Sequence, residues 1–297
     1  MMIQETSSSK MAGISGANSN EERNYKDFTR IQHIALDILK DIVDVCDRNG
    51  IDYILYYGSL LGAVRHKGII PWDNDIDIAM TRDNYEQFLK VAPQQLSSKN
   101  RINIMGSKWM SELKIGRKGT KYCLNFAQDL DIMNQVAVDI FRIDYIRPYV
   151  LNWLPVLDPF KNLLRHAKLS WDEKRLLFRC IDRSTHRFKW VYKFALASLH
   201  ILRLVFTESG LDWAIHKLFV DTSYTSPHLG IIQNPLKHRP WPASFKYITM
   251  PFNDMIVKAP DCYDLLLRGH YGDYMKLPPE NKRYPSHLED WILEVEE

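Results

Sequence analysis

Cysteine is scarce in this chain of 297 residues, which contains only four, at widely separated positions. None of them forms a Cys-x-x-Cys motif or a cluster with histidine, which argues against a structural zinc site and against a disulfide framework. The same cysteine usage favours a reducing compartment. The four residues are Cys46, Cys123, Cys180 and Cys262.

Long apolar runs are missing as well. A membrane-spanning helix needs about 20 apolar residues, and the longest candidate, 191–206, is interrupted by Lys193, His200 and Arg203. The first 20 residues are rich in Ser, Gly, Asn and Ala and contain no apolar stretch that could serve as a signal peptide. We therefore expect a disordered leader over 1–20 and a cytoplasmic protein.

The chain also lacks a strong charge imbalance and several familiar catalytic motifs. Its net charge is +3, with 45% hydrophobic and 25% charged residues, which is typical of a globular protein and gives no reason to expect a nucleic-acid partner. It contains no G-x-x-x-x-G-K-[ST] loop, no G-x-G-x-x-G fingerprint and no G-x-S-x-G elbow. The absence of these motifs argues against a P-loop, a Rossmann dinucleotide-binding loop and a hydrolase with a nucleophile elbow.

A short acidic motif is the most informative feature that is present. Asp75 and Asp77 alternate with Ile76 and Ile78, so in an extended strand both carboxylates would lie on one face. Two carboxylates at close range repel unless a cation or a proton lies between them. Such oxygen-rich sites suit Mg²⁺ or Mn²⁺, and Mg²⁺ usually completes its shell with substrate phosphates.

A third acid, Asp139, lies within a second predicted strand at 136–141 and faces away from Val138 and Ile140. An acid buried in a strand needs a partner, because an unpaired buried carboxylate is costly. With Asp75 and Asp77 it predicts a metal site, in which two ions can clamp the attacking and leaving oxygens of a displacement.

Residues upstream of the acidic motif suit phosphate binding. Gly58 and Ser59 precede a predicted short helix at 60–66, whose free N–H groups would form a phosphate seat. The basic triplet 65–67 either contacts phosphate oxygens or forms a surface cluster. Asp73 either binds a metal through water or organises its loop.

Hydrophobic periodicity predicts an α+β fold, with a mixed sheet flanked by helices. The expected helices are 22–49, ending at Gly50, 83–92 and 263–268; the expected strands are 52–57, 75–80 and 136–141, with a hairpin over 111–125 and a strand-like run over 245–257.

Residues 159–206 differ from the rest, with eleven Lys or Arg against three Asp or Glu. This Leu-rich segment reads as helical. It either packs on the core as a solvated helical insertion or provides a surface for an anionic membrane or an acidic substrate.

The stretch from Gly58 through Asp77, together with Val138-Asp139-Ile140-Phe141, strongly resembles the LicD family of the nucleotidyltransferase superfamily. A C-terminal block formed by 271–279 and Arg283 is similar as well. The resemblance covers roughly 25–145 and 240–290. Three positions depart from the family pattern: Tyr57 replaces a usual Gly, Ser59 a usual Thr and Asn74 a usual Asp.

The resemblance implies a nucleotidyltransferase-fold core and four segments. These are the leader 1–20, a catalytic core 21–150, a variable helical insertion 151–240 and a C-terminal part of the catalytic domain 241–297. The implied activity is metal-dependent transfer of a phospho-alcohol, such as phosphocholine, from a CDP-alcohol donor to a hydroxyl of a cell-surface glycan precursor. A lipid-linked glycan acceptor would bring the protein to the inner face of the membrane.

The resemblance also assigns roles to residues. Asp75, Asp77 and Asp139 are the expected catalytic and metal-binding acids, with Mg²⁺ or Mn²⁺ as cofactor. The residues expected to bind the donor are Gly58, Ser59, Arg65, Lys67 and Lys114. A C-terminal group would either cover the nucleotide or brace the strands that carry the metal ligands; it consists of Tyr271, Gly272, Asp273 and Arg283.

Two alternatives remain open at this point. A nucleotidyltransferase with the same acids would leave a nucleoside monophosphate on a sugar or another small acceptor. A non-catalytic, glycan-binding protein would keep the fold without turnover, but the presence of all three acids argues against it.

Overall fold

The computed structural model describes residues 19–105, 112–124, 135–150, 152–153, 157, 190, 193–194, 197, 207–231, 241–285 and 291–295. Residues 1–18 of the predicted leader and nearly all of the basic segment lie outside these residues, while the last two residues of the leader begin α2. Within the described part of the chain, no helix is both long and apolar enough to cross a membrane.

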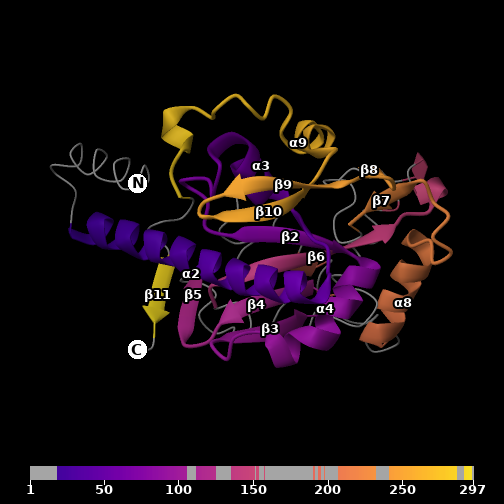
Figure 1. Ribbon diagram of the computed structural model, residues 1–297, viewed down its shortest axis with the longest axis horizontal. Helices are drawn as coiled ribbons and strands as arrows, with labels where there is room; N and C mark the ends of the chain where they lie inside the picture. Colours follow the sequence, from indigo (N-terminus) through magenta and orange to yellow (C-terminus); the bar gives the residue numbers. More distant parts are fainter. Residues whose placement is uncertain are drawn as a thin grey trace.

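Helices alternate with strands as far as α4, after which two runs of four strands are separated by α8 (Figure 1). They are α2 (Ser19–Asn49), β1 (Ile54–Leu55), α3 (Tyr57–His66), β2 (Ile76–Thr81), α4 (Arg82–Gln95), β3 (Asn100–Met105), β4 (Glu112–Arg117), β5 (Thr120–Leu124), β6 (Ala137–Tyr145), α8 (Glu208–Phe219), β7 (His228–Gly230), β8 (Trp241–Pro242), β9 (Tyr247–Phe252), β10 (Met255–Pro260), α9 (Tyr263–Tyr271), the 3-10 turn η3 (Glu280–Lys282) and β11 (Trp291–Val295).

A mixed sheet forms the centre of the molecule, with the strand order β1-β2-β6-β4-β3 and with β7 and β8 continuing from β6. β2 and β6 are parallel, whereas β1 pairs with β2, and β4 with both β6 and β3, in the antiparallel sense. The predicted mixed sheet with flanking helices is thereby confirmed.

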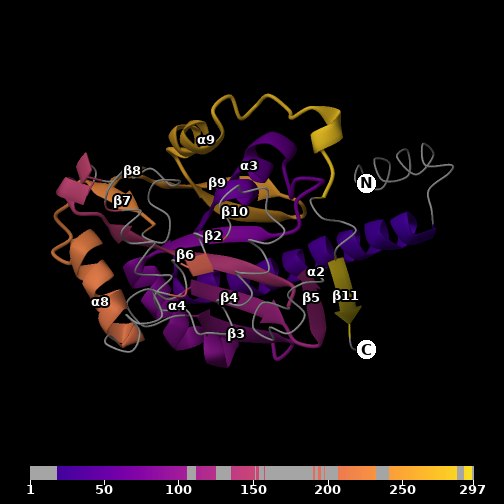
Figure 2. The same cartoon turned by 180° about the vertical axis from the view of Figure 1, so that it is seen from behind.

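Helices α2 and α4 cover one face of this sheet. In Figure 1 α2 runs across the front of the strands, and in Figure 2, seen from behind, the strands lie in front of it. The predicted periodicity of α2 holds, since Ile31, Ile38 and Ile42 are fully buried. Val138 and Ile140 of β6 are buried too, which leaves Asp139 on the opposite face.

The predicted strand 52–57 is shorter than expected, because helix α3 begins at Tyr57. The backbone N–H of Tyr56 donates to the carbonyl of Asp77, and that of Leu60 already donates to Tyr56 as in a helix. Tyr57 makes this abrupt change of direction with φ of 42°, a left-handed conformation that favours glycine. The backbone of Tyr57 is therefore strained, because this residue has a Cβ atom.

The prediction of a hairpin over 111–125 is wrong. Both β4 and β5 form, and Gly119 turns the chain between them with φ of 70°. However, β4 already pairs along both edges, with β3 and β6, while β5 pairs with β11 from the far end of the chain. A strand has only two hydrogen-bonding edges, so β4 has none left for β5.

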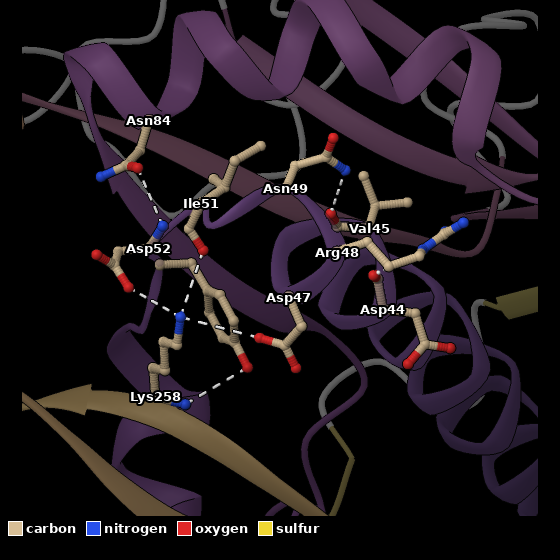
Figure 3. A network of polar contacts seen from close by, with 10 residues as sticks. Asp44, Val45, Asp47, Arg48, Asn49, Ile51, Asp52, Asn84 and Lys258 are labelled. Atoms are coloured by element: carbon tan, nitrogen blue, oxygen red, sulfur yellow. Dashed lines mark hydrogen bonds and ion pairs between the residues drawn. The ribbon is translucent and has the colours of Figure 1, made fainter.

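The strand-like run over 245–257 is a hairpin rather than one strand. β9 and β10 pair in the antiparallel sense, and the chain turns at Asn253, which has φ of 53°. At the base of β10 the Nζ of Lys258 donates to Oδ1 of Asp52 at 2.8 Å and to the carbonyl of Ile51 at 3.4 Å (Figure 3). These bonds fasten the hairpin to the segment between α2 and β1.

Candidate functional site

Three neighbouring strands bring polar side chains into one row. Asp77 of β2 is aligned with Asp139 of β6, and Asp139 is aligned with Lys114 of β4. Residues paired directly across a sheet point to the same face, at a strand spacing of about 4.8 Å. The row therefore lies on the face that α2 and α4 leave uncovered.

Lys114 and Asp139 form a tight ion pair. Nζ of Lys114 donates to both carboxylate oxygens of Asp139, at 2.7 and 2.6 Å, and the two side chains are about a quarter exposed, at 27% and 26%. Lys114 was expected to neutralise charge on a donor phosphate; here its ammonium is engaged with one of the predicted catalytic acids.

The loop before β2 adds Asp73 and Asp75 to the row. Burial, the charge of Asp75 and a hydrogen bond between the two carboxyl groups raise the pKa of Asp73 to about 8. Burial and the charges of Asp75, Asp139 and Asp73 hold the pKa of Asp77 well above its ordinary value, while Lys114 acts in the opposite direction. The four carboxyl groups thus lie close enough to repel one another.

Residues at the start of α3 contact two of these acids. Oγ of Ser59, a buried residue, accepts a hydrogen bond of 2.8 Å from the backbone N–H of Asp77. Gly58 lies against Asp73, because a Cβ atom at Gly58 would come within 2.4 Å of Oδ2 of Asp73. Gly58 and Ser59 were predicted to precede the helix, but they lie in the first turn of α3, which begins at Tyr57. From there they position the acids directly.

Aromatic rings line the side of the cluster that is nearest to Phe141, two residues beyond Asp139 on the same face of β6. The ring of Tyr57 lies 5.4 Å from that of Phe141 and 5.3 Å from that of His270, between ring centroids. Tyr271 follows on α9, and partial burial together with the charges of Asp77, Asp73 and Asp75 raises the pKa of its phenol. The predicted C-terminal block thus reaches the acids through Tyr271.

Arg65 and Arg283 bring positive charge to the same end of the molecule. An Nη of Arg65 donates to the carbonyl of Tyr274 at 2.8 Å, and Nε of Arg283 donates to that of Pro278 at 2.7 Å. Partial burial and the charge of Arg283 lower the pKa of Arg65, and the phenol of Tyr271 acts the other way. Within the described ranges Arg65 forms no ion pair with a carboxylate.

The remaining predicted residues lie at the rim. Lys67 is exposed and ends α3 in a left-handed conformation, with φ of 61°. Gly272 ends α9 with φ of 66°, and Asp273 follows it on the exposed turn. The structure thus brings Asp75, Asp77, Asp139, Lys114 and Ser59 together and leaves these three at the periphery.

The donor set is suited to a hard divalent cation, since it consists of carboxylate oxygens with one ammonium among them. In the part of the chain that is described, no group of three or more His, Cys, Asp or Glu side chains is already gathered around a metal position. Asp139, the third predicted acid, is next to Asp77 on the neighbouring strand, and both of its oxygens accept from Lys114.

Comparison with known proteins points to one family. Residues 50–153 match the family described as LicD/FKTN/FKRP, nucleotidyltransferase domain. Over 277 residues the chain is 27% identical to the lipopolysaccharide cholinephosphotransferase LicD of Haemophilus influenzae, a match that covers 87% of this chain and 95% of the relative. The predicted resemblance is confirmed, and the matched residues, 50–153, hold the whole acid cluster.

Two further relatives match over shorter stretches. An uncharacterized protein of Rickettsia typhi is 42% identical over 165 residues, which is 52% of this chain and 50% of that protein. The human ribitol 5-phosphate transferase FKRP is 51% identical over 39 residues, covering 13% of this chain and 8% of its own.

Sequence reasoning missed two amide side chains that contact the loop before β2. Nε2 of Gln32 donates to the carbonyl of Asp73 at 2.7 Å, and Oδ1 of Asn253 accepts from the N–H of Ile69 at 2.9 Å. Both residues lie far from the acidic motif in sequence, and no pattern of residue types identifies them. Only the three-dimensional fold brings them to the loop.

Proposed function

We propose that this protein transfers a phospho-alcohol, such as phosphocholine, from a CDP-alcohol donor to a hydroxyl of a cell-surface glycan precursor. The observation that carries the proposal is the carboxylate cluster of Asp73, Asp75, Asp77 and Asp139, in which one ammonium group faces four acids. The similarity to a lipopolysaccharide cholinephosphotransferase over most of the chain supports the choice of transferred group and acceptor class.

Asp75, Asp77 and Asp139 would hold Mg²⁺ or Mn²⁺, because the excess negative charge at Asp77 favours a bound cation. The bound ion supplies charge neutralisation on the diphosphate of the donor and on the leaving group. Ser59 fixes the backbone of Asp77, and Gly58 leaves space for Asp73.

The basic residues bind the donor at its diphosphate. Arg65, Arg283 and the exposed Lys67 lie on the α3 and C-terminal side and supply positive charge there. Tyr271, with Gly272 and Asp273 on the turn behind it, covers the nucleotide. Charged hydrogen bonds to phosphate are among the stronger polar contacts in proteins.

The transfer step is a single displacement at phosphorus. The acceptor hydroxyl oxygen forms a bond to the phosphorus that bears the alcohol, and the bond from that phosphorus to the bridging diphosphate oxygen breaks. Cytidine monophosphate leaves with the electron pair of the broken bond. The hydroxyl proton passes to the carboxylate of Asp139, which Lys114 holds in place through two hydrogen bonds.

Release of cytidine monophosphate from a panel of CDP-alcohols tests this function, with crude cell-envelope glycan as acceptor and with Mg²⁺ or a chelator. Wild type is compared with Asp77→Asn and with Asp44→Asn, a control that changes an exposed acid on α2. We expect release that needs metal and that falls at least about 100-fold in Asp77→Asn, with Asp44→Asn unchanged.

The responding donor names the alcohol. Release from CDP-ribitol in preference to CDP-choline would favour the polyol phosphate named for FKRP. A nucleotide found on the acceptor would favour the nucleotidyltransferase alternative instead. No release from any donor, with no metal-dependent donor binding in a thermal shift, would overturn the proposal and favour the glycan-binding alternative.

A further inference from the structure

We propose that Asn253 and Gln32 are positioning residues, which clamp the loop between α3 and β2 and thereby set Asp73 and Asp75 against Asp77. The consequence for metal binding rests on the function proposed above. The loop lies outside the regular elements, between His66 at the end of α3 and Ile76 at the start of β2, and carries two of the four clustered carboxyl groups.

Asn253 holds the first half of the loop from the tip of the β9–β10 hairpin. Its Oδ1 accepts from the N–H of Ile69 at 2.9 Å, and its own N–H donates to the carbonyl of Lys67 at 2.8 Å. The approach is close, because a Cβ atom at Gly68 would lie only 2.6 Å from Oδ1 of Asn253. Glycine at 68 is therefore needed for this contact.

Gln32 holds the second half of the loop from α2. Its Nε2 donates to the carbonyl of Asp73 at 2.7 Å and to that of Ile70 at 3.2 Å. The N–H of Asp73 donates in turn to Ile70 at 2.9 Å. Together, the two amide side chains form hydrogen bonds with the backbone on both sides of Pro71. All of these bonds are to main-chain atoms of the loop.

Both clamping residues belong to rigid parts of the fold that lie outside the family match at 50–153. Gln32 is on α2, whose apolar side is buried on the sheet. Asn253 is on a hairpin with Phe252 and Val257 in the core and with Lys258 bonded to Asp52 at its base (Figure 3). The geometry of the acids inside the domain thus depends on segments before and after it.

The experiment compares side-chain variants with matched controls. Asn253→Gly keeps a residue that tolerates positive φ but removes the acceptor oxygen, whereas Asn253→Asp keeps the oxygen. Gln32→Ala removes the two hydrogen bonds to the carbonyls of Ile70 and Asp73. Asn84→Ala is the control for Asn253, since its Oδ1 accepts from the N–H of Asp52 at 3.0 Å; Gln87→Ala is the control for Gln32, since its Nε2 donates to the carbonyl of Asn49 at 3.0 Å.

Two measurements are made on each purified protein: the affinity for Mn²⁺ alone, from the signal of free Mn²⁺ in electron paramagnetic resonance, and amide hydrogen exchange at Ile69 and Asp73. We expect Asn253→Gly and Gln32→Ala each to weaken Mn²⁺ binding by about five-fold, the factor for one lost hydrogen bond. Exchange at Asp73, which Asn253 does not touch, should accelerate in Asn253→Gly. Asn253→Asp and both controls should behave as wild type.

Several results would overturn the proposal. Faster exchange at Ile69 alone would show a local bond without a clamp, and equal loss of Mn²⁺ affinity in the controls would show general destabilisation. If wild type neither binds Mn²⁺ nor releases cytidine monophosphate, the proposed function fails, and exchange at Asp73 then decides the clamp by itself.

Discussion

Lys114 and Asp139 lie directly opposite each other on β4 and β6, and the lysine ammonium donates to both oxygens of the aspartate at 2.7 and 2.6 Å. This pair places a fixed positive charge in a row of acids. Its effect reaches the next strand, because Lys114 favours the ionised form of Asp77 against the burial and repulsion that disfavour it.

Removing the ammonium should therefore change how activity depends on pH. In Lys114→Met the pKa of Asp77 should rise further, so the acid limb of the pH–rate profile should move to higher pH. Lys114→Arg keeps the charge and should leave the limb closer to that of wild type. Coincident acid limbs for Lys114→Met and wild type would contradict this account of the pair.

Gly58→Ala tests the close approach between α3 and Asp73. The added methyl group would come within 2.4 Å of Oδ2 of Asp73, so that side chain must turn away. We expect turnover to fall by roughly 100-fold, the order of loss when groups around a reacting centre are misplaced by about 1 Å, with little change in unfolding free energy. Gly269→Ala, on α9 with no atom within 4 Å of the new carbon, is the control and should remain active.

Tyr57 combines backbone strain with ring packing, and two variants separate these effects. Tyr57→Gly and Tyr57→Ala both lose the ring contacts with Tyr56, Phe141 and His270. Only Gly accepts φ of 42° without strain. In urea denaturation we expect Tyr57→Gly to be more stable than Tyr57→Ala by about 1 kcal/mol. Equal stability would mean that the backbone relaxes at no cost.

Much of the fold follows from local patterns. The apolar spacing of α2 and the alternation around Asp139 predict a helix and a strand that the structure confirms, because one face of each is buried. The pairing of β5 with β11 was not predictable, since it depends on which strand edges remain free after the sheet has formed. Local spacing carries no information about such distant partners.

In the candidate site, too, some features could be predicted from the sequence and others could not. Asp75, Asp77 and Asp139 were found from strand alternation, and the register of β2 with β6 brings two of them side by side. The bond from Lys114 to Asp139 and the contacts of Asn253 depend on the pairing of separate elements. Sequence reasoning therefore finds acids that the structure brings together, whereas the structure is needed to find what holds them.

A second ionic cluster, at the C-terminal ends of β2 and β6, predicts how stability depends on pH. Arg82 forms an ion pair with Asp144 and lies 2.9 Å from Nε2 of His216 on α8, which is buried. Because the guanidinium has only donors, His216 must accept at Nε2 and stay neutral. Burial and the charge of Arg82 lower the pKa of His216 to about 4.

The direction of the change in unfolding free energy with pH follows from the number of protons that each state binds. Unfolded histidine takes up a proton near pH 6.5, whereas native His216 does so only near pH 4. Between these values the unfolded state binds more protons, so the unfolding free energy should fall as the pH is lowered, by on the order of 2 kcal/mol. Asp73, whose raised pKa has the opposite effect, contributes equally to wild type and to a His216 variant.

Urea denaturation of the metal-free protein at pH values from 7 to 4 measures this effect. In His216→Gln, whose amide oxygen still accepts from Arg82, the loss of stability on acidification should be smaller than in wild type, because the titrating group is gone. His33→Gln, which changes an exposed histidine on α2, should follow the wild-type curve. Parallel curves for His216→Gln and wild type would show that His216 becomes protonated without loosening α8, and that its bond to Arg82 does not hold the helix.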